Sequence, residues 1–116
     1  MQNAIIAFDS KQLTVILTKM LGCFGFETIT VENTEQLRLT LQNKNSDLLL
    51  TDWFLRKDDM LEFLSKQNVR PRTIFVSKEN NPQKIIKALE VGVDEYIIKP
   101  FDNDILQSKL AMVGLL

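Results

Sequence analysis

The chain has 116 residues, of which 45% are apolar and 25% charged, and its net charge is −1. This balance is typical of one globular domain, predicted over residues 1–116. The absence of histidine excludes Ser-His-Asp triads and histidine metal sites, and the near-neutral charge disfavours direct nucleic-acid or membrane binding. No apolar run approaches the roughly 20 residues that span a bilayer, and no basic segment of the signal-peptide type begins the chain. We therefore expect a cytoplasmic protein.

The N-terminal segment combines an apolar run with an amphipathic helix. Residues 4–8 are continuously apolar, as in a strand buried on both faces of a sheet. Apolar residues over 13–24 then recur at three- and four-residue spacing, with Ser10 as the expected N-cap and Gly25 as the expected stop. Cys23, the only cysteine, lies in an apolar stretch and is expected to be buried and unreactive.

The middle of the chain repeats this alternation of strand and helix. The β-branched run at 27–31 predicts a second strand, and a helix is expected over 34–43. A third buried strand is predicted at 48–51. The stretch 53–59 has no clear pattern and is expected to be a loop that leads into a short helix at 60–67.

The C-terminal third completes a regular alternation. Strands are predicted at 73–76 and 96–98, separated by a helix that begins at Asn81–Pro82. A last helix is expected from residue 103 or 104. Five strands alternating with five helices, (βα)5, predict an α/β fold with a doubly wound parallel sheet, for which the flavodoxin-like order 2-1-3-4-5 is favoured.

Polar side chains stand at the ends of four of the predicted strands: Asp9, Asp52, Ser77 and Lys99. Because the carboxyl ends of parallel strands meet at one edge of the sheet, we expect these side chains to lie together. Two carboxylates suit Mg²⁺, while a hydroxyl and an ammonium can bind phosphoryl oxygens. Asp52 could then act as a carboxylate nucleophile. Taken alone, Asp9, Asp52 and Ser77 could each be a cap or turn residue, and Lys99 a solvated lysine. The prediction therefore depends on all four standing at the ends of strands.

Three segments around these residues carry a family resemblance. Residues 51–53 read Thr-Asp-Trp, residues 76–77 read Val-Ser, and residues 96–101 read Tyr-Ile-Ile-Lys-Pro-Phe. In this order, at the ends of the third, fourth and fifth strands, they resemble the CheY-like receiver domains of two-component response regulators. The resemblance extends over nearly the whole chain.

The resemblance implies a role for each site residue. Asp52 would be the phosphoacceptor, and Asp9, Asp52 and the backbone carbonyl of Phe54 would be the metal ligands. Ser77 and Lys99 would bind the phosphoryl group, with the Lys99 peptide bond to the next proline in the cis form. Tyr96 would be an aromatic switch, a role that only the resemblance supports. We further hypothesise that the Phe54 side chain shields an acyl phosphate from water.

Departures from the family pattern surround the expected metal site. Phe8 stands where the family carries the first of two acidic residues, so Mg²⁺ is expected to bind weakly and Phe8 to fill core volume. Arg56 and Met60 stand where the family usually has a proline and a glycine, so the loop is expected to differ. Asp58 or Asp59 is a further option for the missing carboxylate.

Two functions stay open on the sequence. The first is an active receiver that takes a phosphoryl group from a histidine kinase or phosphotransfer protein and binds a downstream protein through its fourth helix, fifth strand and fifth helix; a homodimer is a further option. The second is a degenerate pseudo-receiver, an interaction or dimerisation module that works without phosphate. Retention of all four strand-end residues favours the first.

An enzyme on a similar sheet is disfavoured. The residues after the first strand, Phe-Asp-Ser-Lys-Gln, supply no glycine-rich phosphate cradle of the flavodoxin type. An aspartate-dependent phosphatase would carry a second aspartate at Lys11. We therefore predict a signalling module and not an enzyme.

Overall fold

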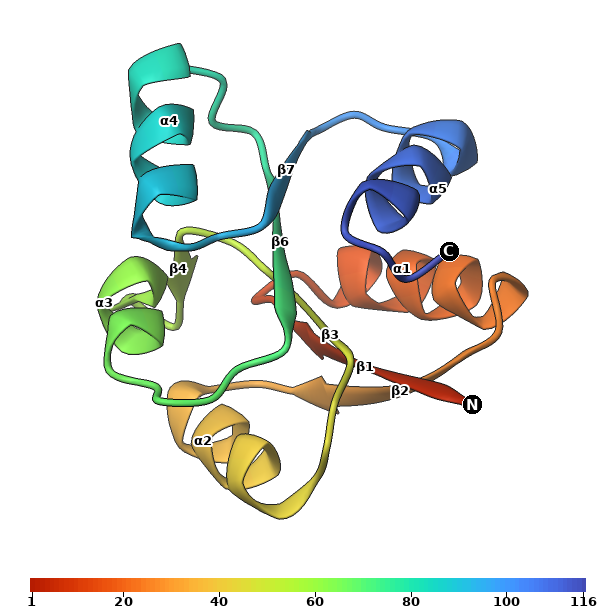
Figure 1. Ribbon diagram of the computed structural model, residues 1–116, viewed down its shortest axis with the longest axis horizontal. Helices are drawn as coiled ribbons and strands as arrows, with labels where there is room; N and C mark the ends of the chain where they lie inside the picture. The colour runs from red at the N-terminus through yellow and green to blue at the C-terminus, as the bar shows by residue number, and fades with distance from the viewer.

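Five parallel strands form the central sheet of the computed structural model, which describes residues 1–116 (Figure 1). They are β1 (Gln2–Ala7), β2 (Phe26–Val31), β3 (Leu48–Thr51), β6 (Arg72–Ser77) and β7 (Glu95–Ile98). Their order across the sheet is β2-β1-β3-β6-β7, and every neighbouring pair is parallel. The predicted flavodoxin-like order 2-1-3-4-5 is therefore confirmed, with β6 and β7 as the fourth and fifth strands.

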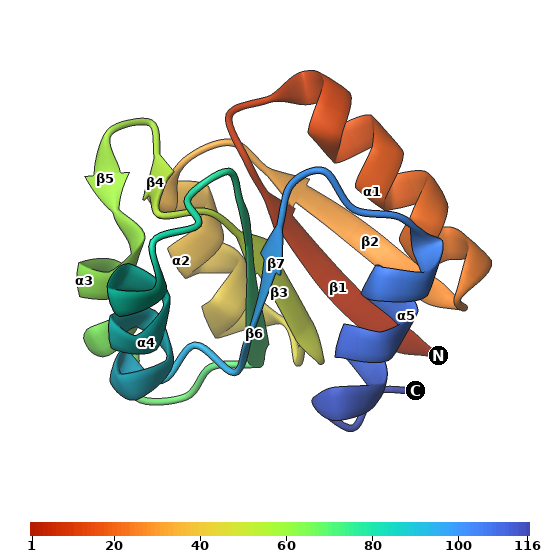
Figure 2. The ribbon, with the colours of Figure 1, turned by 90° about the horizontal axis from the view of Figure 1, so that it is seen from above.

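Five helices cover the two faces of this sheet: α1 (Lys11–Cys23), α2 (Thr34–Asn43), α3 (Met60–Ser65), α4 (Pro82–Val91) and α5 (Asn103–Met112). Helices α1 and α5 lie on one face, and α2, α3 and α4 lie on the other (Figure 2). None of them is long and apolar enough to span a bilayer.

Strand β1 shows why the sheet has a hydrophobic core on each face. Successive side chains of a strand point to opposite faces. Ala4 and Ile6 accordingly belong to the core beneath α1 and α5, whereas Ile5 and Ala7 belong to the core beneath the other three helices. All four are almost completely buried. Burial on both faces is the reason for the continuously apolar run that predicted this strand.

The helix boundaries follow from local capping residues, as the sequence predicts. Ser10 accepts the N–H of Leu13 at the start of α1, and Asn81 accepts the N–H of Gln83 at the start of α4. Gly25, just beyond α1, has a φ of 89°, in the left-handed region that glycine enters at little cost. The caps at Ser10 and Asn81 therefore fix where the loops after β1 and β6 end and the helices begin.

The expectation for Cys23 is wrong, because its side chain is exposed. The buried stripe of α1 consists of Leu13, Leu17 and Leu21. Cys23 lies two residues beyond the last of these, and at about 100° per residue that offset turns its side chain away from the core.

The stretch after β3, predicted as a loop, forms a small antiparallel hairpin. Its strands are β4 (Phe54–Leu55) and β5 (Asp58–Asp59), which lie side by side ahead of α3 (Figure 2). The two turn residues, Arg56 and Lys57, have φ values of 52° and 76°. Two-residue turns with positive φ at both positions favour Asn and Gly, so an Arg-Lys pair carries no turn signal in the sequence.

Candidate functional site

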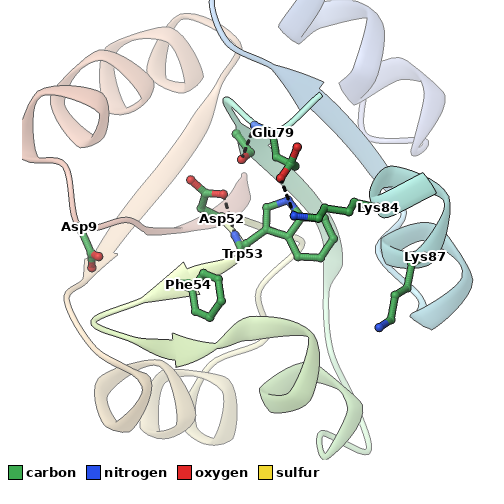
Figure 3. A pocket seen from close by; sticks show the side chains of 8 residues that line it. Asp9, Asp52, Trp53, Phe54, Glu79, Lys84 and Lys87 are labelled. Atoms are coloured by element: carbon green, nitrogen blue, oxygen red, sulfur yellow. Dashed lines mark hydrogen bonds and ion pairs between the residues drawn. The ribbon is translucent and has the colours of Figure 1, made fainter. Parts of the chain in front are cut away.

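A cavity of about 550 Å³ opens at the carboxyl edge of the sheet, where β1, β3 and β6 end (Figure 3). It is lined by Asp9, Asp52, Trp53, Phe54, Ser77, Glu79, Lys84 and Lys87. The structure thus brings together three of the four predicted strand-end residues, from segments up to 68 positions apart in the chain. Lys99 is not among the lining residues.

Asp52 follows β3 directly and is half-buried in this cavity. Its Oδ1 atom accepts the backbone N–H of Trp53 at 2.6 Å. That bond fixes the orientation of the carboxylate and leaves Oδ2 without a hydrogen-bond partner in the chain. An oriented carboxylate with one free oxygen is suited to nucleophilic attack or to metal ligation.

Asp9 follows β1 and is exposed. Its Oδ1 accepts the backbone N–H of Arg56 in the hairpin turn, with an N···O distance of 2.9 Å. In Figure 3 its side chain accordingly points toward the hairpin and not toward Asp52. A proline at position 56, as the family resemblance implies, would have no N–H to offer. The altered loop therefore engages one of the expected metal ligands.

The hairpin also determines how Phe54 presents its backbone. The N–H of Met60 donates to the carbonyl of Trp53 at 2.9 Å, so these two residues form a hydrogen-bonded pair of the ladder. The neighbouring pair, Phe54 and Asp59, is then of the non-hydrogen-bonded type, because the two types alternate along antiparallel strands. The Phe54 carbonyl is therefore free of the ladder, while its ring is 55% exposed beside the cavity.

Ser77 and Lys99 end neighbouring strands but lie in different surroundings. Ser77 is buried, and its Oγ accepts the N–H of Glu79 at 3.1 Å. Lys99 donates its backbone N–H to the Ser77 carbonyl at 2.8 Å, and this residue lines a separate, mainly apolar hollow together with Phe101 and residues of α1. The Lys99–Pro100 peptide bond is cis, as the resemblance implies.

The cationic side chains that line the Asp52 cavity come from α4, and the sequence analysis did not single them out. They are Lys84 and Lys87, whose three-residue spacing after the start of α4 places them on the same side of the helix. The Nζ atom of Lys84 lies 3.0 Å from Oε1 of Glu79. Its ammonium, helped by the N–H of Asn81, lowers the pKa of the Glu79 carboxyl below its usual value. The sequence signal that could have located these two lysines is the predicted helix start at Asn81–Pro82.

Tyr96 is 5% exposed and is therefore almost completely buried. Its hydroxyl donates to the Glu79 carbonyl at 2.9 Å and accepts the indole N–H of Trp53 at 2.7 Å. The Trp53 ring also packs edge-on against Phe75, with ring centroids 5.4 Å apart. Trp53 therefore contacts Asp52 through its backbone and Tyr96 through its side chain.

The residues that could hold Mg²⁺ fit that ion in part. Asp9, Asp52 and the free Phe54 carbonyl all present oxygen, the donor type that Mg²⁺ prefers. Phe8 is 6% exposed and packs in the core beneath α1, so it fills volume as expected and supplies no ligand. Asp58 accepts a hydrogen bond from Thr34, and neither it nor Asp59 lines the cavity.

Several curated proteins resemble this chain along most of its length. The chemotaxis protein CheY1 of Helicobacter pylori is 29% identical, and the match covers 94% of each chain. The phosphate regulon transcriptional regulatory protein PhoB of Rhizobium meliloti is 28% identical over 88% of this chain. The chain spans about half the length of the PhoB relatives, since the match covers 47% of that one.

Solved structures share the same fold. A two-component response regulator from Clostridium difficile superposes with a TM-score of 0.89 at 24% identity, covering 97% of this chain and 95% of its own. A response regulator protein from Burkholderia pseudomallei, crystallised with a phosphorylated aspartic acid, a calcium ion and citrate, has a TM-score of 0.80 at 19% identity; the match covers 95% of this chain and 66% of that one.

Residues 4–111 match the family model of the response regulator receiver domain. This match includes all five strands from Ala4 of β1 onward and every residue around the Asp52 cavity. The sheet order is the one expected from the resemblance to this family. The chain belongs to the response regulator receiver domain family.

Proposed function

We propose that this chain is an active receiver, which accepts a phosphoryl group on Asp52 from a histidine kinase or phosphotransfer protein. The observation that carries the proposal is the Asp52 carboxylate itself. It is oriented by the Trp53 N–H, keeps one oxygen free, and shares a cavity with the Ser77 hydroxyl and two lysines. The function is to accept and release a phosphoryl group, not to catalyse the conversion of a separate substrate.

The chemistry follows from those groups. A carboxylate oxygen of Asp52 attacks the phosphorus atom of the donor, the bond from phosphorus to the donor breaks, and the donor leaves with that electron pair. The added charge is compensated from the cavity wall by Lys84 and Lys87, and the Ser77 hydroxyl can donate to a phosphoryl oxygen. Lys99 ends the strand next to that of Ser77 and lines the neighbouring hollow, and we propose that its ammonium pairs with a phosphoryl oxygen once Asp52 is modified.

Mg²⁺ is the cofactor proposed for this step. Asp9, Asp52 and the Phe54 carbonyl would hold it, and when bound it supplies positive charge next to the phosphoryl oxygens. We expect the affinity to be weak because Phe8 takes the place of an acidic residue. Without that carboxylate, the site has one unit less of negative charge with which to attract a divalent cation.

Modification of Asp52 would change partner binding at the face formed by α4, β7 and α5. Tyr96 lies on β7 at that face, and the exposed apolar residues of these elements include Ile86 at 52%, Ile98 at 43% and Ile105 at 41%. Exposed apolar residues grouped in this way are typical of protein contact surfaces. We propose a downstream protein as the partner in the cytoplasm, or a second copy of the chain, with no direct contact to nucleic acid or membrane.

A second candidate function is the pseudo-receiver, which binds its partner without phosphate. Two observations favour it: Phe8 belongs to the core, and the Asp9 carboxylate accepts a hydrogen bond from the hairpin. Both weaken the metal site on which phosphoryl transfer depends.

One experiment separates the two candidates. The protein is incubated with Mg²⁺ and acetyl phosphate, and its intact mass is measured beside Asp52→Asn and the matched surface variant Asp104→Asn. An active receiver gains one phosphoryl group in the wild type and in Asp104→Asn but not in Asp52→Asn. No adduct in any of the three at any Mg²⁺ concentration would establish the pseudo-receiver instead.

A further inference from the structure

The hydrogen bond between Asp9 and the hairpin joins two parts of the chain that lie 47 residues apart. Asp9 Oδ1 accepts the Arg56 N–H at 2.9 Å, and a hydrogen bond to an ionised acceptor is stronger than one between neutral groups. The same carboxylate lines the Asp52 cavity. Asp9 is therefore at once an anchor of the hairpin and an expected ligand of the metal.

Two further contacts hold the hairpin against the loop after β2 and the first residue of α2. The hydroxyl of Thr34 donates to Oδ2 of Asp58 at 2.6 Å. The side-chain Nε–H of Arg56 donates to the Glu32 carbonyl at 3.1 Å, and a guanidinium nitrogen lies 3.7 Å from the Glu32 carboxylate. Backbone strain opposes these contacts, because Arg56 and Lys57 adopt positive φ although neither is glycine.

We propose that the hairpin and a divalent cation compete for Asp9, so that docking of the β4–β5 hairpin sets the metal affinity of the site. The Asp9 side chain points toward the hairpin and away from Asp52, so a cation held by both carboxylates would draw the Asp9 carboxylate toward Asp52 and pull its Oδ1 from the Arg56 N–H. By linkage, whatever stabilises the docked hairpin weakens metal binding, and bound metal loosens the hairpin. Arg56 is thus a positioning residue, which acts through Asp9. The inference rests on the proposed function only in that Asp9 and Asp52 share one cation.

Two pairs of variants shift the docking of the hairpin without altering a metal ligand. Lys57→Gly relieves the strain of the turn, and Lys57→Gln removes the same charge while keeping that strain. Thr34→Val removes the hydroxyl that holds Asp58. Thr40→Val is its control, since that hydroxyl bonds the Gln36 carbonyl within α2 and contacts no part of the hairpin.

The competition predicts opposite shifts in metal affinity. A residue with positive φ is strained by roughly 1 kcal/mol, equivalent to about a five-fold change in an equilibrium constant. The Mg²⁺ dissociation constant of Lys57→Gly should therefore be about five-fold higher than that of Lys57→Gln. Loss of one hydrogen bond of comparable strength should make the constant for Thr34→Val about five-fold lower than for Thr40→Val.

The measurement uses MgCl₂ alone, without a phosphodonor. Binding is followed by the fluorescence of Trp53, the only tryptophan and a lining residue of the cavity. Hydrogen exchange of the Arg56 amide is followed by NMR in the same titration. We expect saturating Mg²⁺ to speed exchange at Arg56 several-fold, while the buried amide of Leu50 in β3 exchanges as before.

Several results would overturn the competition. Protection of the Arg56 amide by Mg²⁺ would mean that the hairpin bond assists ligation. Equal Mg²⁺ dissociation constants within both pairs of variants would show that hairpin docking and metal binding are not linked. The absence of saturable Mg²⁺ binding in every variant would refute the proposal in the same way. None of these results depends on phosphorylation, so a failure of the linkage is distinguishable from a failure of Asp52 to accept a phosphoryl group.

Discussion

Removal of the Tyr96 hydroxyl, by Tyr96→Phe, perturbs two hydrogen bonds at once. The hydroxyl donates to the Glu79 carbonyl at 2.9 Å and accepts the Trp53 indole N–H at 2.7 Å. Each bond contributes a net ~0.5–1.5 kcal/mol, and the loss leaves a part-buried donor and a carbonyl without partners. The phenyl ring keeps the packing against Phe75, with centroids 6.2 Å apart. We expect the free energy of unfolding to fall by about 1–3 kcal/mol.

A double-mutant cycle isolates the bond between the two aromatic residues. Trp53→Phe removes the indole donor, and the coupling energy with Tyr96→Phe should be about 1 kcal/mol, the value of one hydrogen bond. Urea unfolding is followed by far-ultraviolet circular dichroism, because Trp53→Phe eliminates the only tryptophan. A coupling energy near zero, with Tyr96→Phe as stable as the wild type, would refute the claim that the hydrogen bond between Trp53 and Tyr96 stabilises the fold.

Further predictions concern the core, the cavity rim and the acidic pH range. Leu17→Ala empties a fully buried site beneath α1 and should lower the free energy of unfolding by about 2–5 kcal/mol, checked by urea denaturation; a loss below that range would mean that the core collapses to fill the space. On the hypothesis that the exposed Phe54 ring shields an acyl phosphate from water, Phe54→Ala should shorten the half-life of phosphorylated Asp52 in a mass-spectrometric decay assay; an unchanged half-life would contradict that shielding. Glu79 has its pKa lowered by Lys84, so its contribution to stability is present above its unfolded value of 4.5 and is lost as the pH falls toward the lower, folded value. The difference in urea midpoint between the wild type and Lys84→Gln should therefore be constant near neutrality and shrink on acidification below 4.5, and a difference that persists in acid would contradict this origin.

The sequence by itself determined the sheet order and most of the strand-end chemistry. Burial on both faces leaves a strand continuously apolar, and local capping by residues such as Ser10 and Asn81 marks where helices begin. Parallel strands bring their carboxyl ends together, so Asp9, Asp52 and Ser77 were expected at one edge of the sheet, and they do line one cavity. Their roles in phosphoryl transfer stay predictions.

Only the tertiary structure decided where the long side chains and the irregular loop lie. Lys99 was expected beside Asp52, but the cations that line the cavity are Lys84 and Lys87, because the direction of a flexible side chain depends on what packs around it.

The backbone conformation of the hairpin was likewise decided by the tertiary structure. Its turn has Arg56 and Lys57 at positive φ, a conformation that contacts with distant residues stabilise and that no local sequence pattern predicts. The consequence reaches the metal site, since the Arg56 N–H engages Asp9 across 47 positions of sequence. A hydrogen bond of that range is a property of the folded chain, because it exists only when the loop after β1 and the hairpin have both been placed by the sheet.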